Sequence, residues 1–350
     1  MENFGRREFI ITGIGVALST TSLFANRHNI VELPQKPHQI YRKRGKLPGK
    51  RVLLIGGIHG NEIGAYKSAD LLIDCDIERG ELIIIPRSNF TSILAKQRGY
   101  NGDMNRKFDT LSKQDPDYPF VTFLKEAILE FKPDLVVSMH DGFGFANPHN
   151  SHWGQSIVID EKSFKNFALY EEAIRYVEGA NRYLKRHKLH LINTRTFSNT
   201  LHKEQRKALT GWCLRNDIKA ICIESSRNLS LNDQIYTHLH ILNQIFQHYQ
   251  IAIKPTIGEI TENISRWIPN ADISISLAID GKRLKLRRSA SLHIPSSSRI
   301  RVEKIEGTRG SFVVADGFDL NLEKIHTSDP IQLTIKNDYQ RRFAIQLIPS

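Results

Sequence analysis

The 350-residue chain is poor in cysteine and in long hydrophobic runs, and it has no internal repeat or low-complexity tract. Its three cysteines, Cys75, Cys213 and Cys222, include no Cys-x-x-Cys pair, which excludes a disulfide framework as the basis of the fold. After the N-terminal segment, no stretch reaches the roughly 18 uninterrupted apolar residues of a membrane-spanning helix. We therefore expect a soluble mature protein without stable membrane insertion.

The composition is that of an ordinary globular protein. Hydrophobic residues make up 40% of the chain and charged residues 25%, which excludes the collagen-like, disordered and coiled-coil classes. The length allows one large domain or two smaller ones, with a sizeable core. Lysine and arginine number 49 against 37 aspartates and glutamates, giving a net charge of +12. That excess favours an anionic partner, and nucleic acid, a membrane or cell-wall surface and an acidic substrate all fit it.

The first 25 residues have the pattern of a twin-arginine export signal. An apolar run from Phe9 to Phe24 follows Arg6 and Arg7 and ends at Ala25, a small residue suited to signal cleavage. The alternative is an uncleaved membrane anchor, although the run is short and contains serine, threonine and glycine. We expect a periplasmic protein, and that location argues against nucleic acid as the partner.

Between Arg51 and about Lys254, short apolar runs alternate with segments of helical periodicity. The runs predict buried strands at 52–55, 82–85, 135–137, 157–159 and 220–223. Apolar residues at three- and four-residue spacing predict helices over 120–131 and 235–245. This alternation predicts an α/β domain with a mixed, mostly parallel sheet flanked by helices, and active groups in loops at strand ends.

The pattern changes after about Lys254, where short alternating runs are separated by turn signals. These runs lie at 273–279, 300–302, 312–314 and 331–335. The Asp-Gly pairs at 280–281 and 316–317 separate them, so we expect a smaller all-β domain over 255–350 after a catalytic domain over 26–254. A basic run at 282–288 fits either a solvated edge or a contact with an anionic cell-wall polymer.

Three potential metal ligands follow predicted strands. His59 and Glu62 come just after the strand that ends in Gly56-Gly57, and His140 closes the run at 135–137. Imidazole nitrogens and carboxylate oxygens are suitable zinc ligands, and catalytic zinc commonly takes three protein ligands and leaves a position for water. A His-x-x-Glu pair is weak by itself, but the three residues together at strand ends predict one metal site.

Two other segments carry groups suited to peptide chemistry. The loop Gln97–Phe108 contains Arg98, Asn105 and Arg106, and an arginine can bind a free terminal carboxylate with two hydrogen bonds. The alternative for this loop is an exposed basic turn. Glu224 follows the apolar strand at 220–223, where burying an acid is costly without a partner, so a functional role is favoured.

These motifs, in this order and spacing, resemble the zinc carboxypeptidase superfamily, which also includes the succinylglutamate desuccinylase and aspartoacylase deacylases. The strings Gly102-Asp103-Met104-Asn105-Arg106-Lys107-Phe108 and Trp153-Gly154-Gln155-Ser156-Ile157 resemble most closely the murein D,L-carboxypeptidases that determine helical cell shape. The resemblance covers roughly 51–249. It implies a zinc carboxypeptidase-like fold and a Zn²⁺ cofactor.

The resemblance also implies a role for each motif residue. The zinc ligands would be His59, Glu62 and His140. Glu224 would be the general base and Arg98 would stabilise the oxyanion. The substrate's terminal carboxylate would bind Asn105 and Arg106, and Trp153 would line the pocket for the last residue.

Two features depart from the cell-shape enzymes. His59 stands where they carry glutamine, and one domain follows the catalytic part where they have two. The expected function is a periplasmic zinc metallocarboxypeptidase that trims a murein stem tripeptide to a dipeptide. An N-acyl amino acid deacylase on the same zinc site is the alternative enzyme. A non-catalytic murein-binding protein is the alternative of another class.

Overall fold

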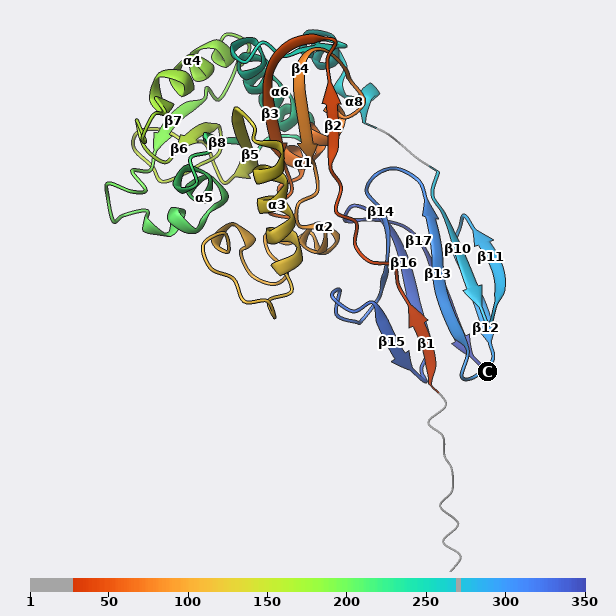
Figure 1. The fold of residues 1–350 in the computed structure, drawn as a ribbon. Helices are drawn as coiled ribbons and strands as arrows, with labels where there is room; N and C mark the ends of the chain where they lie inside the picture. Colours follow the sequence, from red (N-terminus) through yellow and green to blue (C-terminus); the bar gives the residue numbers. More distant parts are fainter. Residues whose placement is uncertain (1–27, 269–271) are drawn as a thin grey trace, which may run out of the picture.

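Figure 1 shows the computed structural model of the protein, which describes residues 28–268 and 272–350. The predicted signal segment lies outside these residues. None of the helices within them is both long enough and apolar enough to cross a membrane. All three cysteines are free thiols, as the absence of a Cys-x-x-Cys pair suggested.

An eight-stranded mixed sheet forms the centre of the larger domain, as the alternating pattern predicted. Its strand order is β2-β4-β3-β5-β8-β6-β7, with β9 beside β4. The strands β4, β3, β5 and β8 run parallel to one another. The strands β2 and β9 run antiparallel to β4, and β6 runs antiparallel to β8. The bounds are β2 (Tyr41–Arg44), β3 (Leu47–Ile55), β4 (Asp76–Ile85), β5 (Leu135–Gly142), β6 (Ser156–Ile159), β7 (His190–Asn193), β8 (Ala220–Ser226) and β9 (Ala252–Lys254).

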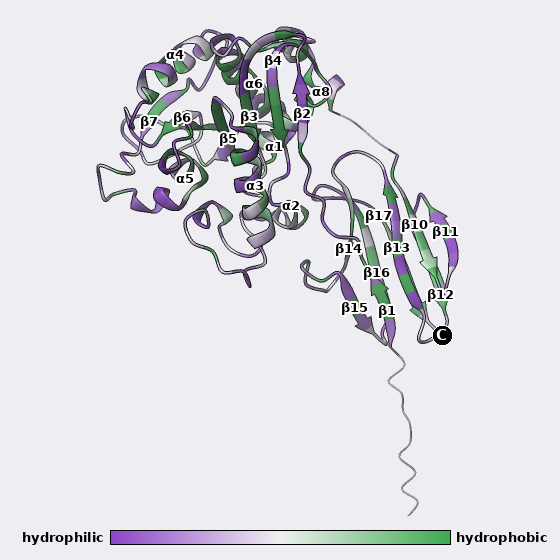
Figure 2. Ribbon diagram, in the orientation of Figure 1, coloured by the Kyte–Doolittle hydropathy of each residue, from purple (hydrophilic) through white to green (hydrophobic). Residues whose placement is uncertain are grey.

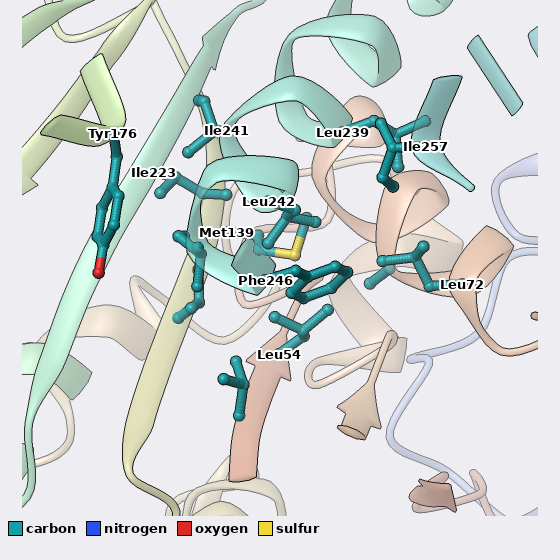
Figure 3. Close-up of a cluster of buried hydrophobic side chains, with 14 of the residues drawn as sticks. Leu54, Leu72, Met139, Tyr176, Ile223, Leu239, Ile241, Leu242, Phe246 and Ile257 are labelled. Carbon is teal, nitrogen blue, oxygen red and sulfur yellow. The ribbon is translucent and has the colours of Figure 1, made fainter. Parts of the chain in front are cut away.

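Helices cover both faces of this sheet, whose central strands contain runs of hydrophobic residues (Figure 2). On β3, Val52 and Leu54 face one core, while Leu53 and Ile55 face the other. The first core is covered by α1 (Ile63–Leu72), α4 (Leu169–Asn181), α6 (Leu231–His248), α7 (Ile257–Glu262) and α8 (Ile264–Trp267). The second is covered by α3 (Tyr118–Phe131) and α5 (Leu209–Arg215). Figure 3 shows side chains of the first core.

Short helical turns complete the larger domain. They are α2 (Phe90–Ala95), η1 (Met104–Arg106) and η2 (Lys203–Lys207). The side chain of Asn89 caps α2 by accepting a hydrogen bond from the Ser92 N–H, and Asp103 caps η1 in the same way through the Asn105 N–H. The segment from Gln97 to Phe108, predicted as a loop, therefore contains one short turn of helix.

The smaller domain is a sandwich of two sheets around its own apolar core, in line with the expected all-β domain. One sheet has the order β11-β10-β13-β1-β15 and the other β12-β17-β16-β14. The bounds are β1 (Asn29–Glu32), β10 (Ser274–Ile279), β11 (Lys282–Leu286), β12 (Ala290–Ile294), β13 (Arg299–Glu306), β14 (Ser311–Ala315), β15 (Lys324–Thr327), β16 (Ile331–Asn337) and β17 (Gln340–Pro349).

The N-terminal strand β1 departs from the division expected from the sequence. The expected domain of 26–254 includes this strand, but it pairs in parallel with β13 and antiparallel with β15 (Figure 1). Val31 of β1 is fully buried in the core of the sandwich. The chain therefore begins its described part in the smaller domain and crosses to the larger one before β2.

The basic run at 282–288 falls on an outer strand. It contains β11, which among the described strands pairs only with β10 and is largely exposed. The Asp280-Gly281 turn joins the two strands, with φ of 47° and 82° at the two positions. Positive φ at both turn residues matches the right-handed twist of a hairpin, and glycine adopts it without a steric penalty. The turn signal in the sequence was therefore correct.

The two domains meet across an interface with an apolar part and a charged part. Phe90 of α2 packs edge-on against Phe312 of β14, with ring centroids 5.4 Å apart. Beside them, Arg87 reaches from the end of β4 to Asp70 of α1 and to Asp338, in the turn between β16 and β17. Both contacts measure 2.7 Å, and all three side chains are buried.

Candidate metal centre

The turn after β3 brings His59 and Glu62 into the centre of the larger domain. Glu62 occupies the N-cap position of α1, and its N–H donates to the His59 carbonyl at 3.3 Å. The turn passes so close to α2 that a Cβ on Gly60 would lie 2.0 Å from the Ser92 carbonyl oxygen. Only glycine fits at that position, because it has no Cβ. The glycine of this motif therefore allows the approach that buries both ligand candidates.

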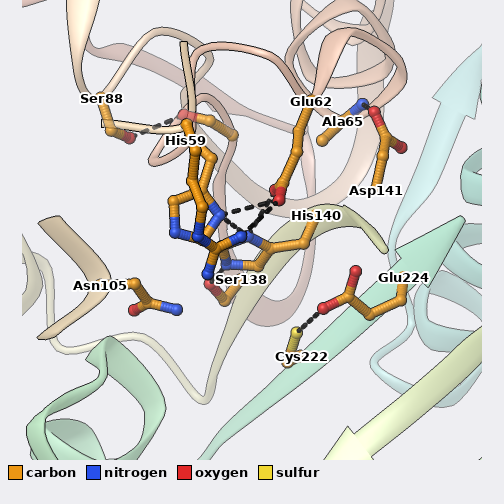
Figure 4. A network of polar contacts seen from close by, with 12 residues as sticks. His59, Glu62, Ala65, Ser88, Asn105, Ser138, His140, Asp141, Cys222 and Glu224 are labelled. Atoms are coloured by element: carbon orange, nitrogen blue, oxygen red, sulfur yellow. Dashed lines mark hydrogen bonds and ion pairs between the residues drawn. The ribbon is translucent and has the colours of Figure 1, made fainter. Parts of the chain in front are cut away.

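His140 lies on β5, the strand next to β3, and its side chain meets those of His59 and Glu62 (Figure 4). The Nδ1 atoms of the two histidines are 3.1 Å apart. The Glu62 carboxylate lies 2.9 Å from His59 Nδ1 and 2.7 Å from His140 Nδ1. All three side chains are buried, and one ligand atom from each lies within 4.8 Å of the others. The structure thus brings together the three ligands expected from the sequence.

The donor set fits a zinc ion. Two imidazole nitrogens and a carboxylate oxygen are ligands that zinc accepts. Each histidine is also held by a second contact: His59 Nε2 lies 2.9 Å from Asp103 Oδ1, and His140 Nε2 lies 2.9 Å from Ser138 Oγ. Such outer contacts fix the ring orientation and leave the Nδ1 atoms free for metal.

Electrostatics among these groups favour ionised Glu62. Burial alone would raise the pKa of Glu62, but the two imidazoles beside it lower that pKa well below the ordinary value. Burial likewise lowers the pKa of His59, yet the Glu62 and Asp103 carboxylates raise it above the ordinary value. The pKa of His140 is lowered by burial. Ionised Glu62 and neutral imidazoles are the forms of these side chains that bind a metal ion.

Glu224 lies on β8 directly opposite His140 of β5 in the strand register. Its side chain is 7% exposed, and its Oε2 atom has no hydrogen-bond partner within the described residues. The Cys222 thiol donates a weak hydrogen bond to Oε1 at 3.6 Å. Burial, together with the Glu62 and Asp141 carboxylates, raises the pKa of Glu224 well above its usual range. Such a carboxyl is suited to holding and releasing a proton.

A cavity of about 600 Å³ connects all the predicted site residues. Arg98, Asn105, Arg106 and Trp153 line it together with the three ligand candidates and Glu224. This volume is in the range of a small-molecule binding pocket. The alternative of an exposed basic turn for the loop is therefore wrong in part: Asn105 and Arg106 are half-buried and belong to the cavity wall.

The polar groups in the cavity wall are oriented by their neighbours. The Leu209 N–H donates to Asn105 Oδ1 at 3.0 Å, which leaves the amide NH₂ of Asn105 available to a ligand. The Arg106 guanidinium donates to the carbonyl of Asn105 at 2.9 Å. Arg98 pairs with Asp103 at 3.0 Å and Glu62 at 3.3 Å, although its side chain is 46% exposed. Arg98 therefore lies beside the ligand cluster, on its solvent side.

Several residues of the site were not assigned from the sequence. Asp103 lay within the loop that the sequence singled out, but its contact with His59 spans 44 positions and no motif spacing indicates it. Asp141 accepts hydrogen bonds from Ser225 Oγ at 2.5 Å and the Ala65 N–H at 3.1 Å, so it ties β8 and α1 to β5. Asp160 and Arg227 also line the cavity.

Comparison with known proteins points to one family. A family described as "carboxypeptidase controlling helical cell shape catalytic" matches residues 16–265, well over half of the chain. No curated protein matches the chain.

Solved structures with a similar fold come from Helicobacter pylori. The apo cell shape determinant protein Csd4 is 24% identical, with a TM-score of 0.69 over 89% of this chain and 76% of that chain. Its tripeptide-bound structure is 19% identical, with a TM-score of 0.61 over 90% of this chain and 100% of that chain. An mDAP-bound form, described as a D,L-carboxypeptidase, is 19% identical, with a TM-score of 0.58 over 88% and 100%. These likenesses show a shared fold.

Proposed function

The chain belongs to the family of carboxypeptidases controlling helical cell shape, and from that premise we propose that it is a zinc-dependent murein D,L-carboxypeptidase of the periplasm. It would remove the last residue of a murein stem tripeptide and leave a dipeptide. The observation that carries the proposal is the cluster of His59, Glu62 and His140 on a cavity that also holds Glu224 and Arg106. The substrate is taken from the tripeptide- and mDAP-bound structures of the similar H. pylori protein.

His59, Glu62 and His140 would hold the metal. When bound there, zinc would act as a Lewis acid, making a water more acidic and polarising the scissile carbonyl. Glu224 accepts the proton of the attacking water and then passes it to the leaving amine. Its raised pKa, caused by burial and by nearby carboxylates, suits the second of these transfers.

Arg106 and Asn105 would position the substrate. The guanidinium offers a fork of donors to the free carboxylate of the last residue, and the Asn105 amide, oriented by Leu209, adds another donor. Arg98 would stabilise the negative charge that develops on the carbonyl oxygen, and losing one such donor typically costs about 3–4 kcal/mol. Because Arg106 selects a free carboxylate, the enzyme would cut at the end of a peptide and not within it.

The periplasmic location rests on the resemblance and on the twin-arginine pattern around Arg6 and Arg7. Murein is the substrate that an exported enzyme of this family would meet. The net charge of +12 would help to keep the enzyme near anionic wall polymer, an attraction that salt weakens.

Mass spectrometry of muropeptides tests the proposal. Purified protein beginning after Ala25, loaded with zinc, is incubated with a murein tripeptide and separately with N-acyl amino acids. We expect loss of the terminal residue from the tripeptide only. Cleavage of N-acyl amino acids with an intact tripeptide would instead indicate a deacylase, and cleavage of neither by metal-loaded protein would indicate a non-catalytic murein-binding protein. Metal analysis of the protein as purified, before zinc is added, identifies the ion that it holds.

A further inference from the structure

A second cavity of about 600 Å³ lies outside the catalytic cavity and shares no lining residue with it. Its walls are formed by Gln155 before β6, by the segment Tyr183–His187 between α4 and β7, and by the beginning of α6 with the turn before it. Trp153 lines the catalytic cavity and Gln155 lines the second one, so only a short piece of chain separates the two at this point. A cavity of this volume can hold a small-molecule ligand.

Two tyrosines form an aromatic platform in the wall of the second cavity. Tyr183 follows α4, Tyr236 lies on α6, and the buried ring of His240 packs against both. The ring centroid of His240 is 4.4 Å from that of Tyr183, with the planes 14° apart, and 4.2 Å from that of Tyr236. The Tyr183 side chain is still 45% exposed, because His240 covers only one face of its ring. The platform is therefore in place before a ligand binds, which lowers the entropic cost of binding.

His240 has no role in the proposed reaction, and its surroundings explain it as a support for the platform. The side chain is 3% exposed, and neither ring nitrogen has a hydrogen-bond partner within the described residues. Burial lowers the pKa of His240 to about 4, so the imidazole is uncharged at neutral pH. An uncharged aromatic ring is what packing between two tyrosines requires.

Polar side chains of both signs surround the platform. Lys185 and Arg186 line the second cavity, are exposed and form no ion pair with a described residue. On the α6 side, Asp233 accepts a hydrogen bond from Ser230 Oγ at 2.7 Å through Oδ2, and its Oδ1 has no partner within the described residues. The second cavity therefore offers hydrogen-bond donors and an acceptor beside exposed aromatic surface.

This combination selects one class of ligand. A purely anionic ligand would be attracted by the two cations but repelled by Asp233, and an apolar ligand would leave all three charged groups without a partner. A sugar ring avoids both problems. Its C–H face packs on an aromatic ring, while its hydroxyl groups both donate to a carboxylate and accept from a guanidinium or an ammonium.

We propose that the second cavity is a non-catalytic saccharide site that binds sugar rings of the murein glycan strand. The sugar chemistry comes from the cavity itself, whereas the choice of murein as its source rests on the proposed function. Because the two cavities lie on either side of the segment 153–155, a polymer bound in the second one would keep its stem peptides near the catalytic cavity. Such tethering raises the effective concentration of the substrate without a new contact in the catalytic cavity.

Binding of a sugar without any peptide tests the proposal directly. The probe is tri-N-acetylchitotriose, an uncharged chain of three N-acetylglucosamine rings, titrated into the purified protein in a calorimeter. We expect saturable binding to one site with a Kd of about 1 mM or tighter. No binding at several times that concentration would overturn the proposal. A short polyglutamate peptide that binds where the sugar does not would identify an anion site instead. Neither result depends on cleavage of a murein tripeptide, so the proposed function stands or falls separately.

The open ring of Tyr183 should carry much of the affinity. Tyr183→Ala removes the face on which a sugar packs, so we expect the Kd for tri-N-acetylchitotriose to rise at least about 10-fold. Tyr183→Phe keeps the ring and its contact with His240, and its Kd should stay within about twofold of the wild type. If Tyr183→Ala binds the sugar as tightly as the wild type does, the tyrosines are not the platform and the proposal is wrong.

Arg186 provides a second test that leaves the packing around His240 untouched. Arg186→Ala removes hydrogen-bond donors from the cavity wall, and we expect the Kd for the sugar to rise about 3- to 10-fold. The matched control is Arg182→Ala, since Arg182 is exposed at the end of α4 and does not line the second cavity. Its Kd should equal that of the wild type, and an equal rise in both variants would contradict a contact in the cavity. Arg106→Ala should also keep the wild-type Kd, whereas loss of sugar binding there would place the sugar in the catalytic cavity and refute the second site.

Discussion

The interface between the domains and the catalytic cavity both contain buried charged side chains. At the interface these side chains form ion pairs, whereas in the cavity two of the carboxylates do not. At the interface, Arg87 pairs with Asp70 and Asp338, and Lys67 adds a 2.6 Å contact to Asp338. Arg309 gives Asp70 a second cation at 2.8 Å. In the cavity, Glu224 and Asp160 have no cation within ion-pair distance in the described residues. Buried carboxylates thus hold the two domains together at the interface, whereas in the cavity they remain available for reaction.

The pKa shifts of the buried acids differ in the same way between the interface and the cavity. Burial raises the pKa of Asp338, but Arg87 and Lys67 overcome it and bring the value down to about 2. Burial also raises the pKa of Glu224, and the carboxylates of Glu62 and Asp141 raise it further, while Arg98 offsets only part of this effect. Paired charges hold two elements together, whereas unpaired charges are retained where a substrate, metal or proton completes them.

Replacing Glu224, the unpaired acid beside the metal-ligand candidates, should have the largest effect on activity. Glu224→Gln keeps the volume of the side chain but cannot accept a proton, so we expect kcat to fall by about 10³-fold or more. The zinc content should stay at the wild-type value, as measured by metal analysis. Exposed Glu130 of α3 provides the control Glu130→Gln, which should leave kcat unchanged. Retained activity in Glu224→Gln would exclude Glu224 as the base.

Removing the central cation of the interface should mainly affect stability. Arg87→Met leaves Asp70 and Asp338 buried with fewer partners, and breaking a buried ion pair on one side costs about 3–5 kcal/mol of unfolding free energy. Urea denaturation measures this change, with exposed Arg288→Met as the control. The zinc content of the folded protein should not change. A loss below about 1 kcal/mol would show that the paired charges do not hold the domains together.

Replacing Arg106 tests whether this side chain of the cavity binds the free carboxyl end of the substrate. Arg106→Ala should lower kcat/KM on a tripeptide with a free carboxyl end by about 100-fold, equivalent to about 2.7 kcal/mol. A C-terminally amidated tripeptide should be a poor substrate for both proteins, with little difference between them. If the variant digests the free tripeptide as well as the wild type does, the enzyme does not select free carboxyl ends.

The sequence predicted those parts of the fold that depend on local pattern. The buried runs at 52–55, 82–85 and 135–137 are strands of the central sheet, and the helical spacing at 120–131 is α3. By contrast, the pairing of β1 (Asn29–Glu32) could not be predicted, because its partners β13 and β15 lie about 270 and about 295 residues further along the chain. A four-residue strand carries too little pattern to indicate such a distant partner.

The residues of the candidate site likewise include some that the sequence identifies and some that it does not. His59, His140 and Glu224 could be identified because each lies near the carboxyl end of a strand of the parallel part of the sheet, and these ends share one edge. His59 follows β3, whereas His140 and Glu224 lie within the last three residues of β5 and β8. Asp160 could not be identified by that rule. It follows β6, which runs antiparallel to β8, so the end of β6 lies at the deep side of the cavity and not at the edge.

The smallest expected effect concerns acid stability at the interface. Asp338 has a folded-state pKa of about 2, below its ordinary value of 3.8, so it stabilises the fold above about pH 4 and loses this contribution as the pH falls toward 2. The shift corresponds to about 2 kcal/mol. We therefore expect the unfolding free energy of the wild type to fall over this range, and that of Asp338→Asn, lower at neutral pH, to fall less steeply. The exposed Asp217→Asn should keep the wild-type slope in urea titrations at each pH. Identical slopes for the wild type and Asp338→Asn would mean that Arg87 and Lys67 do not stabilise the ionised acid.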